Sequence, residues 1–158
     1  DMSGWTILTS GGSGWMVSSG GRESENAFRT SYMECTREQL INLVDLGFTE
    51  AELDEVPIIQ ASEWFKEMFR GGDSYEFTVE LLDGDGDIIT SFSEVSETDG
   101  DGSSGYDDDV WFQLSHTFSD YGPGLRQIRV QDGGSDAEYW SGHYGVRLDD
   151  ASIVLSRP

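Results

Sequence analysis

Tyr75-Glu76-Phe77-Thr78-Val79-Glu80-Leu81 is the stretch of sequence that decides the fold class. Apolar side chains occupy its first position and every second position after it, and polar side chains stand between them. Successive side chains of a β-strand point to opposite faces, so this alternation predicts a strand with one buried face and one face in water. Strands of this kind are typical of antiparallel sheets.

Shorter apolar runs on both sides of this stretch predict further strands, separated by turn residues. We expect strands near residues 59–64, 88–92, 110–114, 128–130 and 153–155, turns at 71–73, 83–86 and 123–124, and an acidic loop over 93–109. Near the start, Gly4-Trp5 and Gly14-Trp15 flank a turn-rich segment and predict a short hairpin. The sequence therefore predicts an all-β protein, an antiparallel β-sandwich.

Helix signals occur in one place, between residues 36 and 56. Thr36 and Gln39 have the spacing of a capping box, and the apolar residues that follow favour a helix that ends at Gly47. Thr49 and Glu52 repeat the box for a second short helix. We expect two short helices near residues 36–55.

Composition limits the classes of partner. The 158 residues fit a single domain, residues 1–158, and their formal net charge is −22 with Lys66 as the only lysine. Such a surface repels phosphate backbones and anionic lipid, so we expect neither nucleic acid nor membrane as partner. No apolar run approaches the roughly 20 residues of a membrane span. Cys35 is the only cysteine, which excludes an internal disulfide and is compatible with a reducing compartment.

The strongly negative net charge has two possible interpretations. The acidic residues are spread through the chain, as in adaptation to a salty environment. Alternatively, Asp83, Asp85 and Asp87 have the alternating spacing of calcium loops, in which carboxylates on a tight turn converge on one cation. The later glutamate and flanking helices of an EF-hand are absent, so the favoured reading is a solvated turn with no metal and no cofactor.

The two histidines do not predict an enzyme. On a strand, Ser115 and His116 face opposite sides, so they cannot form a catalytic pair. The chain has no nucleophile elbow, zinc-protease motif or phosphate loop. We therefore expect His116 to be structural and the protein to be non-enzymatic.

Motifs along the whole chain share the spacing of one known family. They are Gly4-Trp5, Gly11-Gly12-Ser13-Gly14-Trp15-Met16-Val17, Ser31-Tyr32-Met33-Glu34-Cys35, Gly47-Phe48, Glu63-Trp64, Tyr75-Glu76-Phe77-Thr78-Val79, Tyr139-Trp140-Ser141-Gly142-His143-Tyr144-Gly145 and Ser152-Ile153-Val154. The chain resembles the F-box-associated (FBA) domain, whose best-studied members bind N-linked glycans for a ubiquitin ligase. The resemblance implies a ten-stranded, jelly-roll, galactose-binding-like sandwich with two short helices.

The resemblance also implies a ligand site. In glycan-binding members, an aromatic residue of the Ser-aromatic-x-x-Cys segment and a Tyr-Trp-Lys triplet hold the inner chitobiose of a high-mannose glycan. The matching positions here are Tyr32, Tyr139, Trp140 and Ser141, with serine in place of the lysine. His143 lies near these residues and is a further candidate ligand contact. An aromatic face suits this task because it packs against the apolar face of a sugar ring.

Three functions remain open at this point. The first is a lectin-like recognition domain that binds the core of N-linked glycans or glycoproteins, with ubiquitin-ligase components reached through an F-box region that this chain does not contain. The second is a protein-interaction module of the same fold without sugar binding, and the third is a calcium-dependent carbohydrate-binding module. We expect a monomer, cytoplasmic by family resemblance, although a secreted or high-salt setting stays open. Arg126 and Arg147 match family positions, and we expect them to tie turns to carboxylates or carbonyls.

Overall fold

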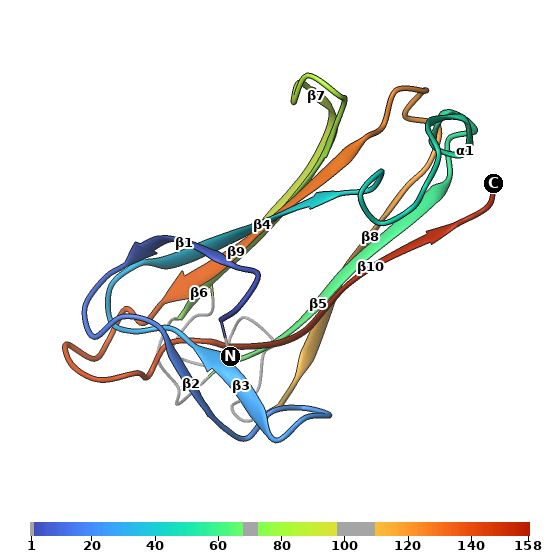
Figure 1. Cartoon of the computed structure of the whole chain (residues 1–158). Coiled ribbons are helices and arrows are strands. Elements are labelled where there is room, and N and C mark those ends of the chain that lie inside the picture. The colour runs from blue at the N-terminus through green and yellow to red at the C-terminus, as the bar shows by residue number, and fades with distance from the viewer. Residues whose placement is uncertain (1, 68–72, 98–109) are drawn as a thin grey trace.

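The computed structural model describes residues 2–67, 73–97 and 110–158. Within these residues the chain forms ten strands and one short helix, arranged as two antiparallel sheets that lie face to face (Figure 1). Sheet A has the order β1-β4-β9-β6-β7, and sheet B has the order β2-β3-β10-β5-β8. The elements are β1 (Thr6–Ser10), β2 (Met16–Ser19), β3 (Asn26–Arg29), β4 (Cys35–Asn42), α1 (Glu50–Asp54), β5 (Ile58–Lys66), β6 (Ser74–Leu82), β7 (Ile88–Glu97), β8 (Phe112–Phe118), β9 (Gln127–Ser135) and β10 (Arg147–Ser156).

The stretch that predicted the fold class is the central part of β6. Tyr75, Phe77, Val79 and Leu81 are fully buried, and the polar residues between them are partly exposed. β6 pairs with β7 on one side and β9 on the other, so its apolar face lies over the core between the sheets. The predicted all-β sandwich is confirmed.

The second of the two expected helices is confirmed as α1. The Thr49 side chain accepts a hydrogen bond of 3.2 Å from the Glu52 amide, and the Thr49 amide donates one of 2.9 Å to the Glu52 carboxylate. This is the reciprocal capping box that the spacing predicts. Leu53 is the buried residue of this single turn of helix.

The first expected helix is wrong, because its N-terminal part is the strand β4. Leu40 and Val44, which the helical spacing places on the buried face, are 57% and 42% exposed. β4 instead pairs with β1 on one edge and β9 on the other, and these two ladders satisfy its backbone. Periodicity alone does not separate a helix from a strand over so short an apolar run.

The expected N-terminal hairpin is also wrong. β1 pairs with β4 in sheet A, whereas β2 pairs with β3 in sheet B. The turn-rich segment between them carries the chain from one sheet to the other. Local turn signals predict a change of direction, but they do not specify the partner strand.

Two smaller boundaries differ from the prediction. The first five residues of the expected acidic loop, 93–97, belong to β7, and β8 begins at Phe112 rather than at Val110. The remainder of that loop, 98–109, and the glycines of the 71–73 turn lie outside the described residues. Arg126 is one of the two arginines expected to tie a turn to a carboxylate or a carbonyl. Its guanidinium donates a hydrogen bond of 2.9 Å to the Asp54 carboxylate, which confirms that expectation.

A charged group is buried between the sheets. Arg37 of β4 and Asp132 of β9 stand directly opposite each other and form two hydrogen bonds, of 2.7 and 2.8 Å. The guanidinium carbon lies 3.9 Å from the ring centroids of both Trp5 and Phe28. Both charged side chains are at most 1% exposed. A planar cation paired bidentately and stacked on aromatic rings is the form in which arginine tolerates burial.

Glu63 brings a second carboxylate from sheet B to this group. Its Oε2 accepts a 2.7 Å hydrogen bond from the Tyr75 hydroxyl, while Oε1 lies 4.0 Å from Arg37 and has no hydrogen-bond partner among the described residues. Burial raises the pKa of Glu63 well above its ordinary value, and the adjacent Asp132 carboxylate raises it further. The folded protein therefore favours a proton on Glu63.

We predict that Glu63→Gln stabilises the protein at pH 7.5. The folded state holds the Glu63 proton more tightly than the unfolded chain, so the wild type loses stability as pH rises from the ordinary pKa of 4.5 toward the higher folded-state value. Glutamine keeps the acceptor for Tyr75 and has no proton to lose. Urea unfolding should give a gain of about 1–3 kcal/mol at pH 7.5 and a smaller gain at pH 5.

Asp132→Asn is the matched control, because it removes the other carboxylate of the same group. It leaves Arg37 buried without its ion-pair partner, and we expect a loss of about 3–5 kcal/mol. A destabilised Glu63→Gln at pH 7.5 would show instead that Glu63 is held as a carboxylate.

Candidate functional site

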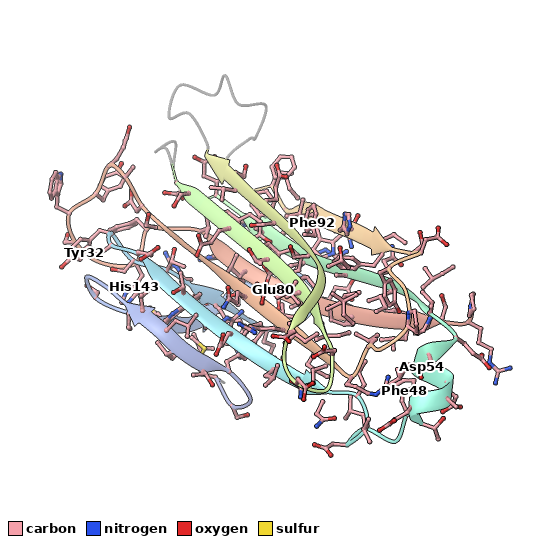
Figure 2. All side chains as sticks on the ribbon, turned by 90° about the horizontal axis from the view of Figure 1, so that it is seen from above. Tyr32, Phe48, Asp54, Glu80, Phe92 and His143 are labelled. Atoms are coloured by element: carbon pink, nitrogen blue, oxygen red, sulfur yellow. The ribbon has the colours of Figure 1, made fainter. Side chains whose placement is uncertain are left out.

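Three loops meet at one end of the sandwich. Residues 136–146 connect β9 to β10, residues 11–15 connect β1 to β2, and residues 30–34 connect β3 to β4. Figure 2 shows Tyr32 and His143 together at this end, whereas α1 lies at the opposite end. We call this region the three-loop end.

Ser31 joins the three loops. Its hydroxyl donates to the Gly142 carbonyl at 2.7 Å and accepts from the Ser13 amide at 2.9 Å. Its backbone carbonyl accepts from the Asp136 amide at 2.9 Å. Since the bonds to Gly142 and Asp136 connect segments more than 100 residues apart in sequence, the 136–146 loop is held by its neighbours and not only by its own turns.

Asp136 shapes the start of the 136–146 loop. Its buried carboxylate accepts hydrogen bonds from the amides of Glu138, at 2.7 Å, and Tyr139, at 3.2 Å. This Asx turn satisfies two backbone donors and directs the chain outward. At the other end of the loop Gly145 is required for space, because a Cβ there would lie 2.2 Å from the Thr30 hydroxyl.

Tyr139 and Trp140 are both exposed. Their relative accessibilities are 47% and 88%, and both lie in the loop rather than in a strand. The sequence left open whether one of these neighbours is buried or both are on a loop, and the second alternative is the observed one. An indole with this exposure contributes little to folding and is available for contact with a partner.

The other predicted site residues lie at the same end. Tyr32 is half-buried, and its ring covers Gly12, where a Cβ would be 2.9 Å from the tyrosine ring. Ser141 is exposed. His143 is half-buried, and its backbone carbonyl accepts a hydrogen bond from the Arg29 guanidinium. All five candidates therefore lie on two of the three loops, and whether they contact a ligand stays a prediction.

Sequence reasoning missed Tyr144. Its ring lies 5.3 Å from that of Tyr139, at an interplanar angle of 48°, and it is 39% exposed. A Cβ on Gly142 would lie 3.0 Å from this ring, so the glycine leaves room for the tyrosine to pack close to the loop backbone. The signal was present in the sequence as a third aromatic residue of the same segment.

The candidate calcium loop is a hairpin turn between β6 and β7. The Asp83 carboxylate accepts hydrogen bonds from the amides of Asp85, at 2.9 Å, and Asp87, at 3.0 Å. Among the described residues, no three side chains of His, Cys, Asp or Glu are grouped so that they could hold a metal ion. The carboxylate that would lead the calcium loop is engaged with the turn itself.

His116 lies between the sheets at their edge, where its ring stacks on Phe92 with centroids 4.2 Å apart and meets the edge of Phe118. Ser115 is exposed on the other side of β8. The pair thus faces opposite sides, as the strand assignment predicted.

No helix in the described part of the chain is long and apolar enough to span a membrane.

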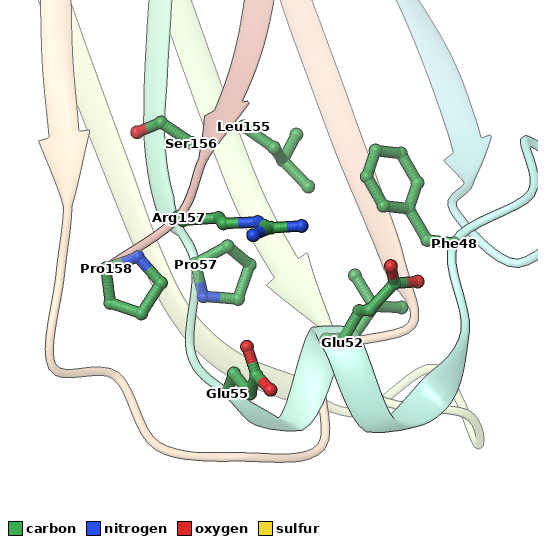
Figure 3. Close-up of a pocket in the computed structure, with 9 residues that line it drawn as sticks. Phe48, Glu52, Glu55, Pro57, Leu155, Ser156, Arg157 and Pro158 are labelled. Carbon is green, nitrogen blue, oxygen red and sulfur yellow. The ribbon is translucent and has the colours of Figure 1, made fainter.

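A cavity of about 440 Å³ lies at the end of the sandwich away from the three loops (Figure 3). Its apolar walls are Phe48, Leu53, Pro57 and Leu155. Its charged lining residues are Glu52 of α1, Glu55 just after α1, and Arg157. None of the five ligand-site residues predicted from the sequence lines this cavity. The exposed aromatic rings and this cavity therefore lie at opposite ends of the described sandwich.

Comparisons with known proteins agree with the sequence resemblance. The family model described as "F-box associated region" matches residues 1–155. The chain is 36% identical over 166 residues to F-box only protein 6 of Bos taurus, covering 99% of this chain and 61% of that protein. It is 34% identical over 164 residues to F-box only protein 2 of Bos taurus, covering 97% and 54%. The chain thus spans somewhat more than half the length of these relatives.

Solved structures support the architecture. A carbohydrate-binding module, TmCBM61, solved in complex with β-1,4-galactotriose, superposes with a TM-score of 0.59 at 12% sequence identity, covering 99% of this chain and 91% of that one. At this identity the likeness extends to the fold alone. It confirms the jelly-roll, galactose-binding-like class of the sandwich.

We predict that Asp136→Ala loosens the 136–146 loop while the sandwich persists. Without the carboxylate, the amides of Glu138 and Tyr139 lose their acceptor and should exchange with solvent at least tenfold faster. Hydrogen exchange followed by NMR measures this directly. Glu138→Gln is the control in the same loop, and equal exchange in both variants would mean that the Asx turn does not order the loop.

Proposed function

Because this chain belongs to the F-box-associated region family, we propose that it is a non-catalytic recognition domain that binds the inner core of N-linked glycans. The single observation that carries the proposal is the exposure of Trp140 at the tip of an anchored loop. Its sequence neighbour Tyr139 packs near Tyr144, with ring centroids 5.3 Å apart, so the loop presents several aromatic rings. Aromatic rings pack against the apolar C–H face of a pyranose and against an acetamide methyl group.

The anchoring of the loop favours affinity. A loop that is ordered before binding loses less conformational entropy when its ligand arrives. Ser31 and Asp136 supply that order through bonds to Gly142 and to the amides that follow Asp136. We assign Trp140 and Tyr139 the stacking contacts, and we assign Tyr32 the side wall.

Polar groups of the same loop give the contact its direction. Ser141 offers a hydroxyl in solvent, and the half-buried His143 of the same loop offers an imidazole ring. Ser141 is shorter than the lysine that glycan-binding relatives carry, so it leaves more room and fewer donors at this position. We expect hydroxyls of the sugar to be recognised by these side chains and by loop amides that the turn leaves unpaired.

The calcium-dependent reading has less support, since Asp83 is committed to its own turn. The alternative function, a protein-interaction module, would use the same exposed rings and differ only in its partner.

In the context of a longer F-box protein, the domain would present a bound glycoprotein to ubiquitin-ligase components. That role implies a cytoplasmic location, and we propose that the domain acts as a monomer.

We predict that Trp140→Ala weakens binding of chitobiose by at least tenfold, equivalent to about 1.4 kcal/mol. Loss of the indole removes a large apolar contact and leaves the sandwich intact, because the side chain is 88% exposed. Isothermal titration calorimetry with chitobiose and with a high-mannose glycopeptide measures the effect. EDTA should leave the affinity unchanged.

Phe48→Ala is the matched control, because it removes an aromatic ring from the cavity at the opposite end. Affinity lost in Phe48→Ala but kept in Trp140→Ala would move the glycan site to that cavity. Absence of any glycan binding by the wild type supports the protein-interaction module, and sensitivity to EDTA supports the calcium-dependent one.

A further inference from the structure

Three basic side chains form a row across sheet B near the three-loop end. Arg147 of β10 stands directly opposite Arg29 of β3 on one side and Lys66 of β5 on the other. Directly opposite residues in antiparallel strands project from the same face, with Cβ atoms about 4.5–5.5 Å apart. Leu148, the neighbour of Arg147, is buried in the core, so the row lies on the face of sheet B that points away from the core. Arg29 and Arg147 are half-buried on that face, and Lys66 is buried.

The two arginines of this row differ from four of the five other arginines in the described residues, the exception being the exposed Arg157 near the C-terminal end. Arg22 pairs with Glu23 and Asp150, Arg37 with Asp132, Arg126 with Asp54 and Glu50, and Arg129 with Glu80. Arg29 and Arg147 have no carboxylate within ion-pair distance among the described residues, and they donate to the backbone carbonyls of His143 and Gly20. In a chain with 31 acidic residues, this arrangement is not a consequence of scarce partners.

The arrangement leaves charge and donors unsatisfied. The Nε atoms of Arg29 and Arg147 are buried and have no hydrogen-bond partner among the described residues. Burial lowers the pKa of Arg29, and the charge of Arg147 lowers it further. Like charges directly opposite on a sheet destabilise it, and a bound anion would remove that repulsion.

We propose that Arg29 and Arg147 form a subsite for a phosphate group carried on a saccharide. Arg29 reaches the 136–146 loop through its bond to the His143 carbonyl, so the subsite adjoins the exposed rings. A sugar stacked on that loop can direct an anionic substituent toward the two guanidinium groups. The inference rests on the proposed function for the sugar and on the arginine pair for the phosphate.

The negative net charge of the protein favours binding of a small anion over binding of an extended polyanion. The net charge of −22 repels an extended polyanion, because its remaining phosphates would lie over acidic surface. A single phosphate needs only the two guanidinium groups, whose planar donor pattern matches its oxygens. Short-range contacts of this kind persist at salt concentrations that screen the surrounding field, since the Debye length is about 8 Å at 0.15 M.

The experiment compares three probes by calorimetry at constant ionic strength: N-acetylglucosamine, N-acetylglucosamine 6-phosphate and inorganic phosphate. The sugar phosphate should bind at least tenfold more tightly than either of the others. Arg147→Gln should remove that advantage and leave chitobiose binding unchanged. Arg129→Gln, which removes an arginine paired with Glu80 on sheet A, should retain wild-type affinity for all probes.

The outcomes separate this inference from the proposed function. Trp140→Ala should weaken both chitobiose and the sugar phosphate, whereas Arg147→Gln should weaken only the sugar phosphate. Equal affinities for the sugar phosphate and N-acetylglucosamine overturn the subsite, as does an Arg147→Gln variant that keeps the advantage. Tight binding of inorganic phosphate that Trp140→Ala does not alter overturns the saccharide as the carrier. Thermal unfolding at constant ionic strength gives a second readout: N-acetylglucosamine 6-phosphate should raise the Tm of the wild type more than N-acetylglucosamine does, and Arg147→Gln should abolish that difference.

Discussion

The ion pair between Arg37 and Asp132 is the interaction on which the arrangement of both sheets depends. It joins adjacent strands of sheet A, and Glu63 and Phe28 bring sheet B to the same point. Removing two charges from water is costly, and only good geometry offsets that cost. The bidentate contact and the stacked rings supply such geometry. A shift of one strand by a single residue would separate the pair, so the buried charge disfavours other registers.

The same strand that carries Asp132 leads directly to the three-loop end. Gly133 and Gly134 follow, and a Cβ at these positions would lie 2.3 Å from the Cys35 carbonyl and 2.2 Å from the Ser74 carbonyl. β9 is therefore pressed closely between β4 and β6 just before it ends. Asp136 then begins the loop. The position of the exposed rings is thus set by backbone packing that starts in the core, which is how a rigid element gives precision to a site on a loop.

The sequence predicted what depends on local physics and failed where distant partners decide. The alternation of residues 75–81 and the capping box at Thr49 involve near neighbours, and both were found where expected. The segment 36–42 has an apolar spacing that fits two structures, and pairing with β9 selects the strand. The sequence alone does not predict that Arg37 is buried, because its burial depends on Asp132, which lies 95 residues away in the chain. Adjacency of Tyr139 and Trp140 predicted only that both could not be buried in one core, since neighbours on a strand face opposite sides. Their place on a loop, where both are exposed, was one of two alternatives that the sequence left open.

Acidity and recognition are compatible because the two use different parts of the surface. Carboxylates distributed over a sandwich keep it soluble and discourage polyanions, whatever the domain binds. Aromatic rings bind sugars through dispersion and apolar contact, which an external field of either sign barely affects. A neutral saccharide can therefore approach the exposed rings without opposing the net charge of −22. Arg29 and Arg147, which have no carboxylate within ion-pair distance among the described residues, lie near those rings and add a local preference of opposite sign. This combination favours a ligand that is mostly neutral and carries one anionic group.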